Sequence, residues 1–259
     1  MTPTQAHAQP PAVPTLLQAH GLGRRFGALH AVRDVSLALD GDSVHAVIGT
    51  NGAGKSTLIN LLSGELPPSS GKVSLRGEDV TRWPQPRRAR AGLGRSYQRN
   101  NIFLPLSVRE NCRLAAQAHL QRPWHVWQGA QACRDSLARA DSALERCGLA
   151  DVATRAAAGL SHGQKRQLEV AMCLAADPCV LLLDEPLAGM GPEESERMLE
   201  LLRGLRRGHA VLLVEHDMDA VFAVADRITV MVNGAVIASG APNEVRSNPE
   251  VQTAYLGEH

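Results

Sequence analysis

Residues 49–57 read GTNGAGKST, and this stretch decides how the chain folds. It lies between two apolar runs, residues 44–48 and 58–62, which suit a strand before it and a helix after it. Gly49, four further residues and then Gly54-Lys55-Ser56 have the spacing of a phosphate-binding loop, in which backbone N–H groups and a helix start face one concavity. A simple glycine-rich turn has no use for the Lys-Ser pair. We therefore expect a nucleotide site, called the phosphate loop below, formed by Gly49, Thr50, Asn51, Gly52, Ala53, Gly54, Lys55, Ser56 and Thr57.

Within this loop, Lys55 is expected to reach the terminal phosphates and Ser56 to hold Mg²⁺.

The composition of the chain is that of a folded protein of 259 residues, of which 44% are hydrophobic. Its 27 Lys and Arg residues against 26 Asp and Glu give a formal net charge of +1, so no global field favours nucleic acid as a partner. Five cysteines without a CxxC pair argue against a disulfide framework or a zinc site and for reduced thiols in the cytoplasm.

The first residues, 1–14, contain several prolines and few large apolar side chains, so we expect a disordered tail before one domain over residues 15–259. This tail lacks the apolar centre of a signal peptide. Residues 16–39 alternate roughly between apolar and polar side chains, which predicts short antiparallel strands. The ring of Phe26 could stack on an adenine or pack in the core, and the sequence leaves both open.

Six arginines lie between residues 82 and 99, namely Arg82, Arg87, Arg88, Arg90, Arg95 and Arg99. A nucleic-acid patch would carry more interleaved aromatic residues than Trp83 and Tyr97, so a solvated face is favoured. Farther on, Ser107 and Glu110 have capping-box spacing, and a second helix is expected over about residues 135–147. Residues 99–177 are therefore expected to form a helical insertion.

Residues 160–164, LSHGQ, open the next expected helix, with Ser161 as its N-cap. Capping does not explain Gly163 in the first turn, where glycine costs about 1 kcal/mol against alanine. A group that must approach the backbone closely, such as a phosphate, would explain it.

Two apolar strands are expected to end in polar residues that could bind a metal ion or take part in catalysis. Residues 179–183 lead into Asp184 and Glu185, which suit Mg²⁺ binding and proton abstraction from an attacking water, respectively. Residues 210–214 lead into Glu215 and His216. A lone histidine is usually structural. His216, however, is expected at the end of a strand, which is where ligands gather in open α/β sheets.

These segments together resemble the ATP-binding subunit of an ABC transporter, from Leu16 to the C-terminus. In family order the matching motifs are Phe26 as the adenine-stacking aromatic, the phosphate loop as Walker A, Gln98 as the Q-loop, LSHGQ as the signature, VLLLDEP at 180–186 as Walker B, and His216 as the switch histidine. The segments VEHDM at 214–218, AYLGEH at 254–259 and AGM at 188–190 look most like the branch that takes up branched-chain amino acids and urea.

The resemblance implies an α/β fold: a P-loop NTPase (RecA-like) core with an antiparallel β subdomain and an inserted α-helical subdomain. It implies ATP and Mg²⁺ as cofactors, with Lys55 neutralising phosphate charge and Glu185 activating water. His216 would position that water, and Gln98 would sense the nucleotide. The Mg²⁺ would be held by Ser56, Gln98 and Asp184.

The same resemblance implies partners. Ser161, Gly163 and Gln164 would cap ATP held by another ATP-binding subunit, a copy of this chain or a different one, in a head-to-tail pair. Integral membrane permease subunits and, indirectly, a solute-binding protein complete the expected assembly, which places the chain in the cytoplasm on the inner face of the cell membrane. A soluble ATPase of iron–sulfur assembly and a lipopolysaccharide-export ATPase remain alternatives, whereas the long coiled coil of a DNA-repair ATPase is missing.

Two positions depart from the family pattern. His162 replaces the usual signature glycine, a variant that resembles urea-type subunits, and its ring could add charge near a phosphate or merely point to solvent. Gly191 replaces the usual D-loop aspartate, which puts one contact between subunits in doubt.

Residues 99–104 are the expected docking surface for a membrane partner, because donors there precede an apolar cluster, Ile102, Phe103 and Leu104. Packing of this cluster inside the helical insertion is the alternative.

Overall fold

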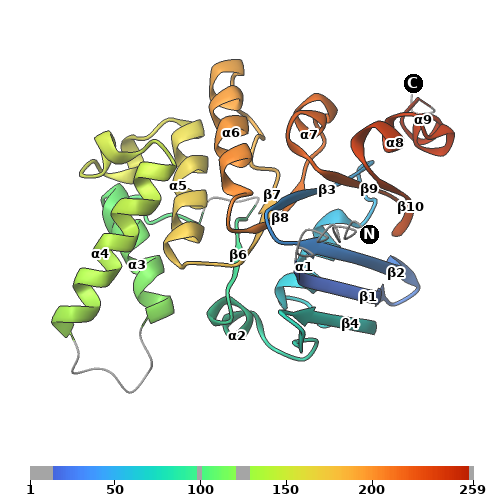
Figure 1. The fold of residues 1–259 in the computed structure, drawn as a ribbon, viewed down its shortest axis with the longest axis horizontal. Coiled ribbons are helices and arrows are strands. Elements are labelled where there is room, and N and C mark those ends of the chain that lie inside the picture. The colour runs from blue at the N-terminus through green and yellow to red at the C-terminus, as the bar shows by residue number, and fades with distance from the viewer. Residues whose placement is uncertain (1–13, 98–100, 121–128, 257–259) are drawn as a thin grey trace, which may run out of the picture.

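The computed structural model describes residues 14–97, 101–120 and 129–256 of the chain. The predicted tail, apart from Pro14, lies outside the described residues. Gln98 also lies outside them. Figure 1 shows two sheets beside one another and a group of helices set apart from them. This arrangement is the α/β fold with an antiparallel β part that the sequence predicted.

A six-stranded sheet forms the centre of the molecule. Its strands lie in the order β10 (Ala235–Gly240), β9 (Arg227–Val232), β3 (Ser43–Gly49), β8 (Ala210–Val214), β7 (Val180–Asp184) and β6 (Leu93–Arg95). All neighbours are parallel except β9 and β10, which form a hairpin. Both faces of the three middle strands are covered, which explains why β7 and β8 are apolar up to their last residues and why β3 is buried on both sides instead of alternating.

The second sheet is antiparallel and has the order β2 (Leu29–Asp40), β1 (Thr15–Phe26), β4 (Ser70–Leu75) and β5 (Glu78–Asp79). Antiparallel pairing was predicted, but β1 and β2 are each 12 residues long instead of short. Several register shifts between them absorb the glycines that suggested breaks. The helix α1 (Lys55–Ser63) packs between the two sheets through Leu58, Ile59, Leu61 and Leu62.

Three helices make up the separate group: α3 (Val108–Leu120), α4 (Gly129–Arg146) and α5 (His162–Ala175). Helix α4 begins earlier than predicted and ends near the expected stop at Gly148, whose φ is +68°. The expected capping box at α3 is half formed. Ser107 Oγ accepts a hydrogen bond from Glu110 N at 3.1 Å, whereas the Glu110 carboxylate pairs with Arg113 instead of reaching back.

The remaining helices surround the sheets, and they are α2 (Gln85–Arg90), α6 (Pro192–Leu205), α7 (Met218–Val224), α8 (Pro242–Arg246) and α9 (Pro249–Leu256). Helices α6 and α7 share one apolar cluster with α5 and one face of the six-stranded sheet. The other face of that sheet packs on α1 and the antiparallel sheet. Two cores therefore support the carboxyl ends of the parallel strands from both sides.

Arg88 contradicts the prediction that the arginines near α2 form a solvated face. Its side chain is fully buried, and its guanidinium donates to the carbonyl oxygens of Leu61 and Leu62 at 2.8 and 2.7 Å. Thr81 and Trp83 supply two further carbonyl acceptors. Arg88 thus caps the C-terminal end of α1, where carbonyl groups lack helical partners. Burial lowers the pKa of this guanidinium to about 10, so it remains charged at neutral pH.

We expect Arg88→Met to lower the free energy of unfolding by at least ~2 kcal/mol, because it leaves buried carbonyl groups without a charged donor. Arg87→Met is the matched control, since Arg87 is exposed and only stacks on Trp83, with 3.7 Å between its guanidinium carbon and the ring centre. Urea unfolding of both variants measures the difference. Equal stability of the two would show that the capping bonds contribute nothing.

Candidate nucleotide site

The register of the parallel strands brings the expected site residues to one edge of the sheet. Val214 on β8 lies opposite Val47 on one side and Asp184 on the other. The phosphate loop after β3, Asp184 and Glu185 at the end of β7, and His216 after β8 therefore leave the same edge. This edge is where open α/β sheets place their ligands.

Backbone geometry explains two glycines of the phosphate loop. A Cβ on Gly49 would lie 2.2 Å from the Met231 carbonyl oxygen, and one on Gly54 would lie 2.3 Å from that of Ala31. Gly54 also has a φ of +98°, in the left-handed region, immediately before α1 begins at Lys55. Side chains at these positions would push the loop off its neighbours, so the compact turn into the helix requires glycine.

Lys55 lies across the inside of the loop. Its Nζ donates to the carbonyl oxygens of Gly49 at 2.6 Å and Thr50 at 3.0 Å, and the residue is buried. Burial lowers the pKa of this ammonium group, whereas the nearby Glu185 and Asp184 carboxylates act to raise it. The positive charge therefore faces two acids at the end of β7, which is separated from β3 by β8. Ser56 is exposed at the start of the same helix, and Thr57 is partly buried.

Asp184 provides an unsatisfied acceptor in this place. It is buried, and among the described residues its Oδ1 has no hydrogen-bond partner. Burial is also the main reason that the pKa of Asp184 is raised, against the lowering effect of Arg95 and Lys55. A buried carboxylate oxygen and an exposed serine hydroxyl, on segments that leave the same edge of the sheet, suit a hard cation such as Mg²⁺, which commonly takes one or two protein ligands together with phosphate oxygens. The donor set present here therefore fits Mg²⁺.

Glu185 follows directly and has a φ of +49°, which is uncommon for a residue with a side chain. Its backbone N–H donates to the Val214 carbonyl oxygen at 2.9 Å, which continues the pairing of β7 with β8. Unusual backbone conformations of this kind are held by their surroundings and concentrate at functional sites. The carboxylate is only partly buried, so a water molecule can approach it.

His216 is exposed at the end of β8 and lies next to a buried acid. Glu215 is completely buried, and its carboxylate accepts from the backbone N–H of Leu187 at 2.9 Å and of His216 at 3.2 Å. Burial raises the pKa of Glu215, although these backbone donors oppose the change. The His216 Nδ1 lies 3.6 Å from the same carboxylate. Glu215 thus ties the segment after Walker B to the segment that carries His216.

Phe26 is 44% exposed, so the possibility of an ordinary core phenylalanine is wrong. The Arg24 guanidinium carbon lies 4.7 Å from its ring centre, and the ring stands at the end of β1. An exposed ring with a cation near it remains available for stacking on a base.

Gln98 itself lies outside the described residues, but both flanks of residues 98–100 are fastened to α5. The Arg166 guanidinium donates to the Tyr97 carbonyl oxygen at 2.9 Å, and Asn101 N–H donates to Glu169 at 3.0 Å. Arg166 and Glu169 are both buried and form an ion pair at 3.1 Å. A buried, charged pair is more sensitive to disturbance than a surface pair, since losing either partner leaves a buried charge.

The signature segment caps α5 as predicted. Ser161 Oγ accepts from Gln164 N–H at 3.1 Å, and the Gln164 side chain accepts from Ser161 N–H, which completes a capping box. Figure 1 shows α5 well apart from α1. No hydrogen bond or ion pair connects residues 160–164 to the phosphate loop in the described part of the chain. Ser161, Gly163 and Gln164 are therefore brought together with one another but not with Lys55.

His162 is exposed, and its ring makes a contact that the sequence did not indicate. Its Nε2 lies 3.0 Å from the Ala188 carbonyl oxygen, and since a carbonyl only accepts, this ring nitrogen carries the proton. The exposed ring does more than point to solvent, because it fastens the signature segment to the chain after β7. A charge near a phosphate stays a prediction. Gly191, at the other departure from the family pattern, precedes α6 in an extended conformation.

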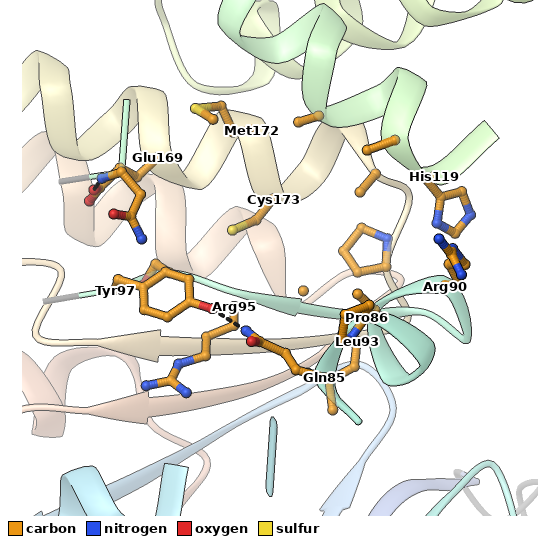
Figure 2. A pocket seen from close by; sticks show the side chains of 18 residues that line it. Gln85, Pro86, Arg90, Leu93, Arg95, Tyr97, His119, Glu169, Met172 and Cys173 are labelled. Atoms are coloured by element: carbon orange, nitrogen blue, oxygen red, sulfur yellow. Dashed lines mark hydrogen bonds between the residues drawn. The ribbon is translucent and has the colours of Figure 1, made fainter. Parts of the chain in front are cut away.

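A groove of about 370 Å³ lies between the sheet and the separate helices. Figure 2 shows Met172 and Cys173 of α5 on one wall, and Leu93, Pro86 and Tyr97 on the other. The Gln85 side chain donates to the Tyr97 hydroxyl within the groove. The lining is mainly apolar, which is typical of a site for another apolar surface.

The residues of the docking cluster predicted from the sequence differ in their exposure. Phe103 and Leu104 are 55% and 44% exposed, whereas Ile102 packs against the core, so the alternative of core packing holds only for Ile102. The buried Asn111 fixes the Phe103 backbone by accepting from its N–H at 2.7 Å and donating to its carbonyl oxygen at 3.1 Å. The Phe103 side chain is exposed and lies two residues along the chain from Asn101, which lines the groove.

Sequence reasoning missed the side chains that act through tertiary contact, namely Arg166, Glu169, Glu194 and Glu215. Arg166 and Glu169 sit three residues apart on a helix, which the sequence alone would suggest to be an ordinary surface pair. The acidic residue before His216 was visible in the sequence, but its burial was not. Glu194 contacts the signature segment through Ser161, 33 residues away in the sequence.

Comparison with known proteins gives two family matches. Residues 32–188 match the family model described as ABC transporter, and residues 235–259 match the one described as branched-chain amino acid ATP-binding cassette transporter. None of the helices within the described ranges is long and apolar enough to cross a membrane.

Several proteins of known role resemble the whole chain. The high-affinity branched-chain amino acid transport ATP-binding protein LivG of Salmonella typhimurium is 41% identical over 94% of this chain and 98% of its own. The corresponding BraF protein of Pseudomonas aeruginosa is 38% identical, also over 94% and 98% of the two chains. Among solved structures, a nucleotide-free ATP-binding cassette from an ABC transporter superposes with a TM-score of 0.83 at 28% identity, covering 93% of this chain and 99% of that one.

Proposed function

Because this chain belongs to the ABC transporter family and is one of its ATP-hydrolysing subunits, we propose that it powers the import of branched-chain amino acids or a related small polar solute such as urea. The solute class is supported by the relatives LivG and BraF, which are named for branched-chain amino acid transport, and by the match over residues 235–259. These relatives do not favour iron–sulfur assembly or lipopolysaccharide export as alternatives. The single observation that carries the ATPase role is the meeting of Lys55, Asp184 and Glu185 at one sheet edge.

Each residue of that edge has one task in the proposed hydrolysis. Lys55 exchanges its loop carbonyl acceptors for phosphate oxygens, and backbone N–H groups of the phosphate loop surround the phosphates. Glu185 accepts a proton from the attacking water, while His216 orients that water. Ser56, Asp184 and Gln98 are the proposed holders of Mg²⁺, which supplies positive charge against the phosphates when bound. Phe26 stacks on the adenine.

The proposed site is completed by a second ATP-binding subunit. Helix α5, at whose start Ser161, Gly163 and Gln164 lie, is well apart from α1 of the same chain, so these residues would not cap a nucleotide bound there. In a head-to-tail pair, the start of α5 faces the phosphates held by the other subunit and adds hydrogen-bond donors to them. The pair would be made by this chain with itself or with a different ATP-binding chain.

We propose that the groove between the sheet and the separate helices receives a cytoplasmic segment of an integral membrane permease. The groove lies between α5 and residues next to Gln98. A movement of α5 or of the segment around Gln98 would therefore displace a bound permease segment. Phe103 and Leu104 are exposed and follow the groove residue Asn101 by two and three positions in the chain, so they add apolar surface to this segment. A solute-binding protein would act on the far side of the membrane and would not touch this chain.

Phe103→Ala is expected to weaken assembly with the permease about tenfold or more, because an aromatic anchor at an interface centre commonly contributes about 2 kcal/mol. The isolated variant should fold and bind ATP normally, since the ring is outside the core. Leu29→Ala, which removes a 65% exposed leucine from β2, is the control. Co-purification from membranes measures assembly, and equal recovery of both variants would move the docking site elsewhere.

The proposed function is tested by affinity purification of the tagged chain from detergent-solubilised membranes. We expect to recover permease subunits and to find that ATP hydrolysis by the complex increases when a branched-chain amino acid and its binding protein are supplied. Recovery of iron–sulfur scaffold proteins, or of lipopolysaccharide-export components, would overturn the assignment of the solute.

A further inference from the structure

The start of α5 is already in contact with an anion that belongs to this chain. Ser161 Oγ donates to a Glu194 carboxylate oxygen at 2.9 Å. Glu194 lies in the first turn of α6, 33 residues away in the sequence, and is partly buried. A hollow of about 170 Å³ opens at this point, and both Ser161 and Glu194 line it.

Gly163 shows how closely the carboxylate approaches. A Cβ on Gly163 would lie 2.5 Å from the Glu194 carboxyl carbon and 2.7 and 2.8 Å from its two oxygens. The glycine that suggested a phosphate in the sequence is therefore covered, in the free subunit, by an acidic side chain of its own chain. Any side chain at residue 163 would push Glu194 away.

Glu194 and an incoming phosphate would compete for the same hydrogen atom. A serine hydroxyl has one O–H donor, and Ser161 gives it to Glu194 while accepting from Gln164 N–H. Phosphate oxygens also need donors, and their negative charge repels a carboxylate at contact distance. The two anions therefore cannot occupy the start of α5 together.

We propose that Glu194 is a built-in competitor of the nucleotide phosphate at the signature segment, and that it raises the ATP concentration needed for two ATP-binding subunits to pair. This inference rests on the proposed head-to-tail arrangement. In the free subunit Glu194 satisfies Ser161 and holds α6 against α5. When the partner's ATP arrives, the side chain rotates away, and the phosphate takes over the Ser161 hydroxyl and the space over Gly163.

The competition predicts that removing the charge of Glu194 favours pairing. In the full-length chain carrying Glu185→Gln, which retains ATP, a further Glu194→Gln is expected to lower the ATP concentration for half-maximal pairing about tenfold, the size of one hydrogen bond to a charged group. Glu193→Gln is the matched control. It removes the same charge from the same helix turn, but Glu193 is exposed and its carboxylate lies 3.7 Å from Arg197 instead of Ser161.

Pairing is measured by sedimentation across a range of ATP–Mg²⁺ concentrations, for the chain alone and mixed with any second ATP-binding chain recovered with the permease. A shift for Glu194→Gln, with less than twofold change for Glu193→Gln, supports the competition. A purely supporting role of Glu194 predicts the reverse, because loosening the start of α5 would raise the ATP requirement. An unchanged or raised requirement overturns the inference. If no variant pairs at any ATP concentration, the proposed head-to-tail arrangement fails, and the inference fails with it.

Discussion

Glu185→Gln is expected to bind ATP as tightly as the wild-type chain and to hydrolyse it at least about 10²-fold more slowly in the assembled transporter, because general-base assistance typically contributes ~10²–10⁴-fold. Glutamine fills the same volume at the end of β7 and keeps the backbone bond to Val214, but it cannot accept a proton from water. Steady-state phosphate release and nucleotide binding, measured on the same preparation, separate the two effects.

Glu200→Gln on the exposed side of α6 controls for the loss of one negative charge. Near-normal hydrolysis by Glu185→Gln would remove this residue from the role of base. The uncommon φ of +49° at Glu185 gives a further check, since a substitution that only relaxed the backbone would change ATP affinity and turnover together.

Lys55→Ala is expected to weaken ATP binding itself by about 10²-fold, because a charged donor to phosphate contributes roughly 1.5–3 kcal/mol per hydrogen bond. Lys55 lies inside the phosphate loop, where its charge faces the carboxylates of Asp184 and Glu185. Isothermal titration with ATP–Mg²⁺ measures the affinity, and Lys72→Ala on the exposed part of β4 is the matched control. Unchanged affinity in Lys55→Ala would refute the assignment of residues 49–57 as the phosphate cradle.

Much of the fold follows from local sequence pattern. The apolar runs before Gly49 and Asp184 become the middle strands of the sheet, and Ser161 caps α5 as the pattern predicted. These features depend on residues within a few positions of one another, so the sequence displays them directly. The phosphate loop and the acids after β7 could be placed at the same edge because parallel strands end together.

Features that depend on distant contacts could not be predicted. Arg88 belongs to an arginine-rich stretch, yet it is buried because carbonyl groups at the end of α1 need donors. Gly163 correctly signalled a close approach, but the group that approaches in the free subunit is Glu194. His162 contacts Ala188 through a turn whose geometry no local pattern describes. Each of these partners lies 26 or more residues away along the chain.

A cryo-EM structure of the Glu185→Gln transporter with ATP–Mg²⁺ would show whether ATP is hydrolysed at a site shared by two ATP-binding subunits. In that structure, we expect the γ-phosphate of each bound ATP to lie within hydrogen-bond distance of Lys55 or, in a different ATP-binding chain, of the lysine that corresponds to it. Across the interface, the Ser161 hydroxyl should contact the phosphate held by the other subunit, and Glu194 should be turned away. A shared site would be refuted by a structure at saturating ATP in which the nucleotide is bound at Lys55, Ser161 is still hydrogen-bonded to Glu194, and no second subunit contacts the phosphate.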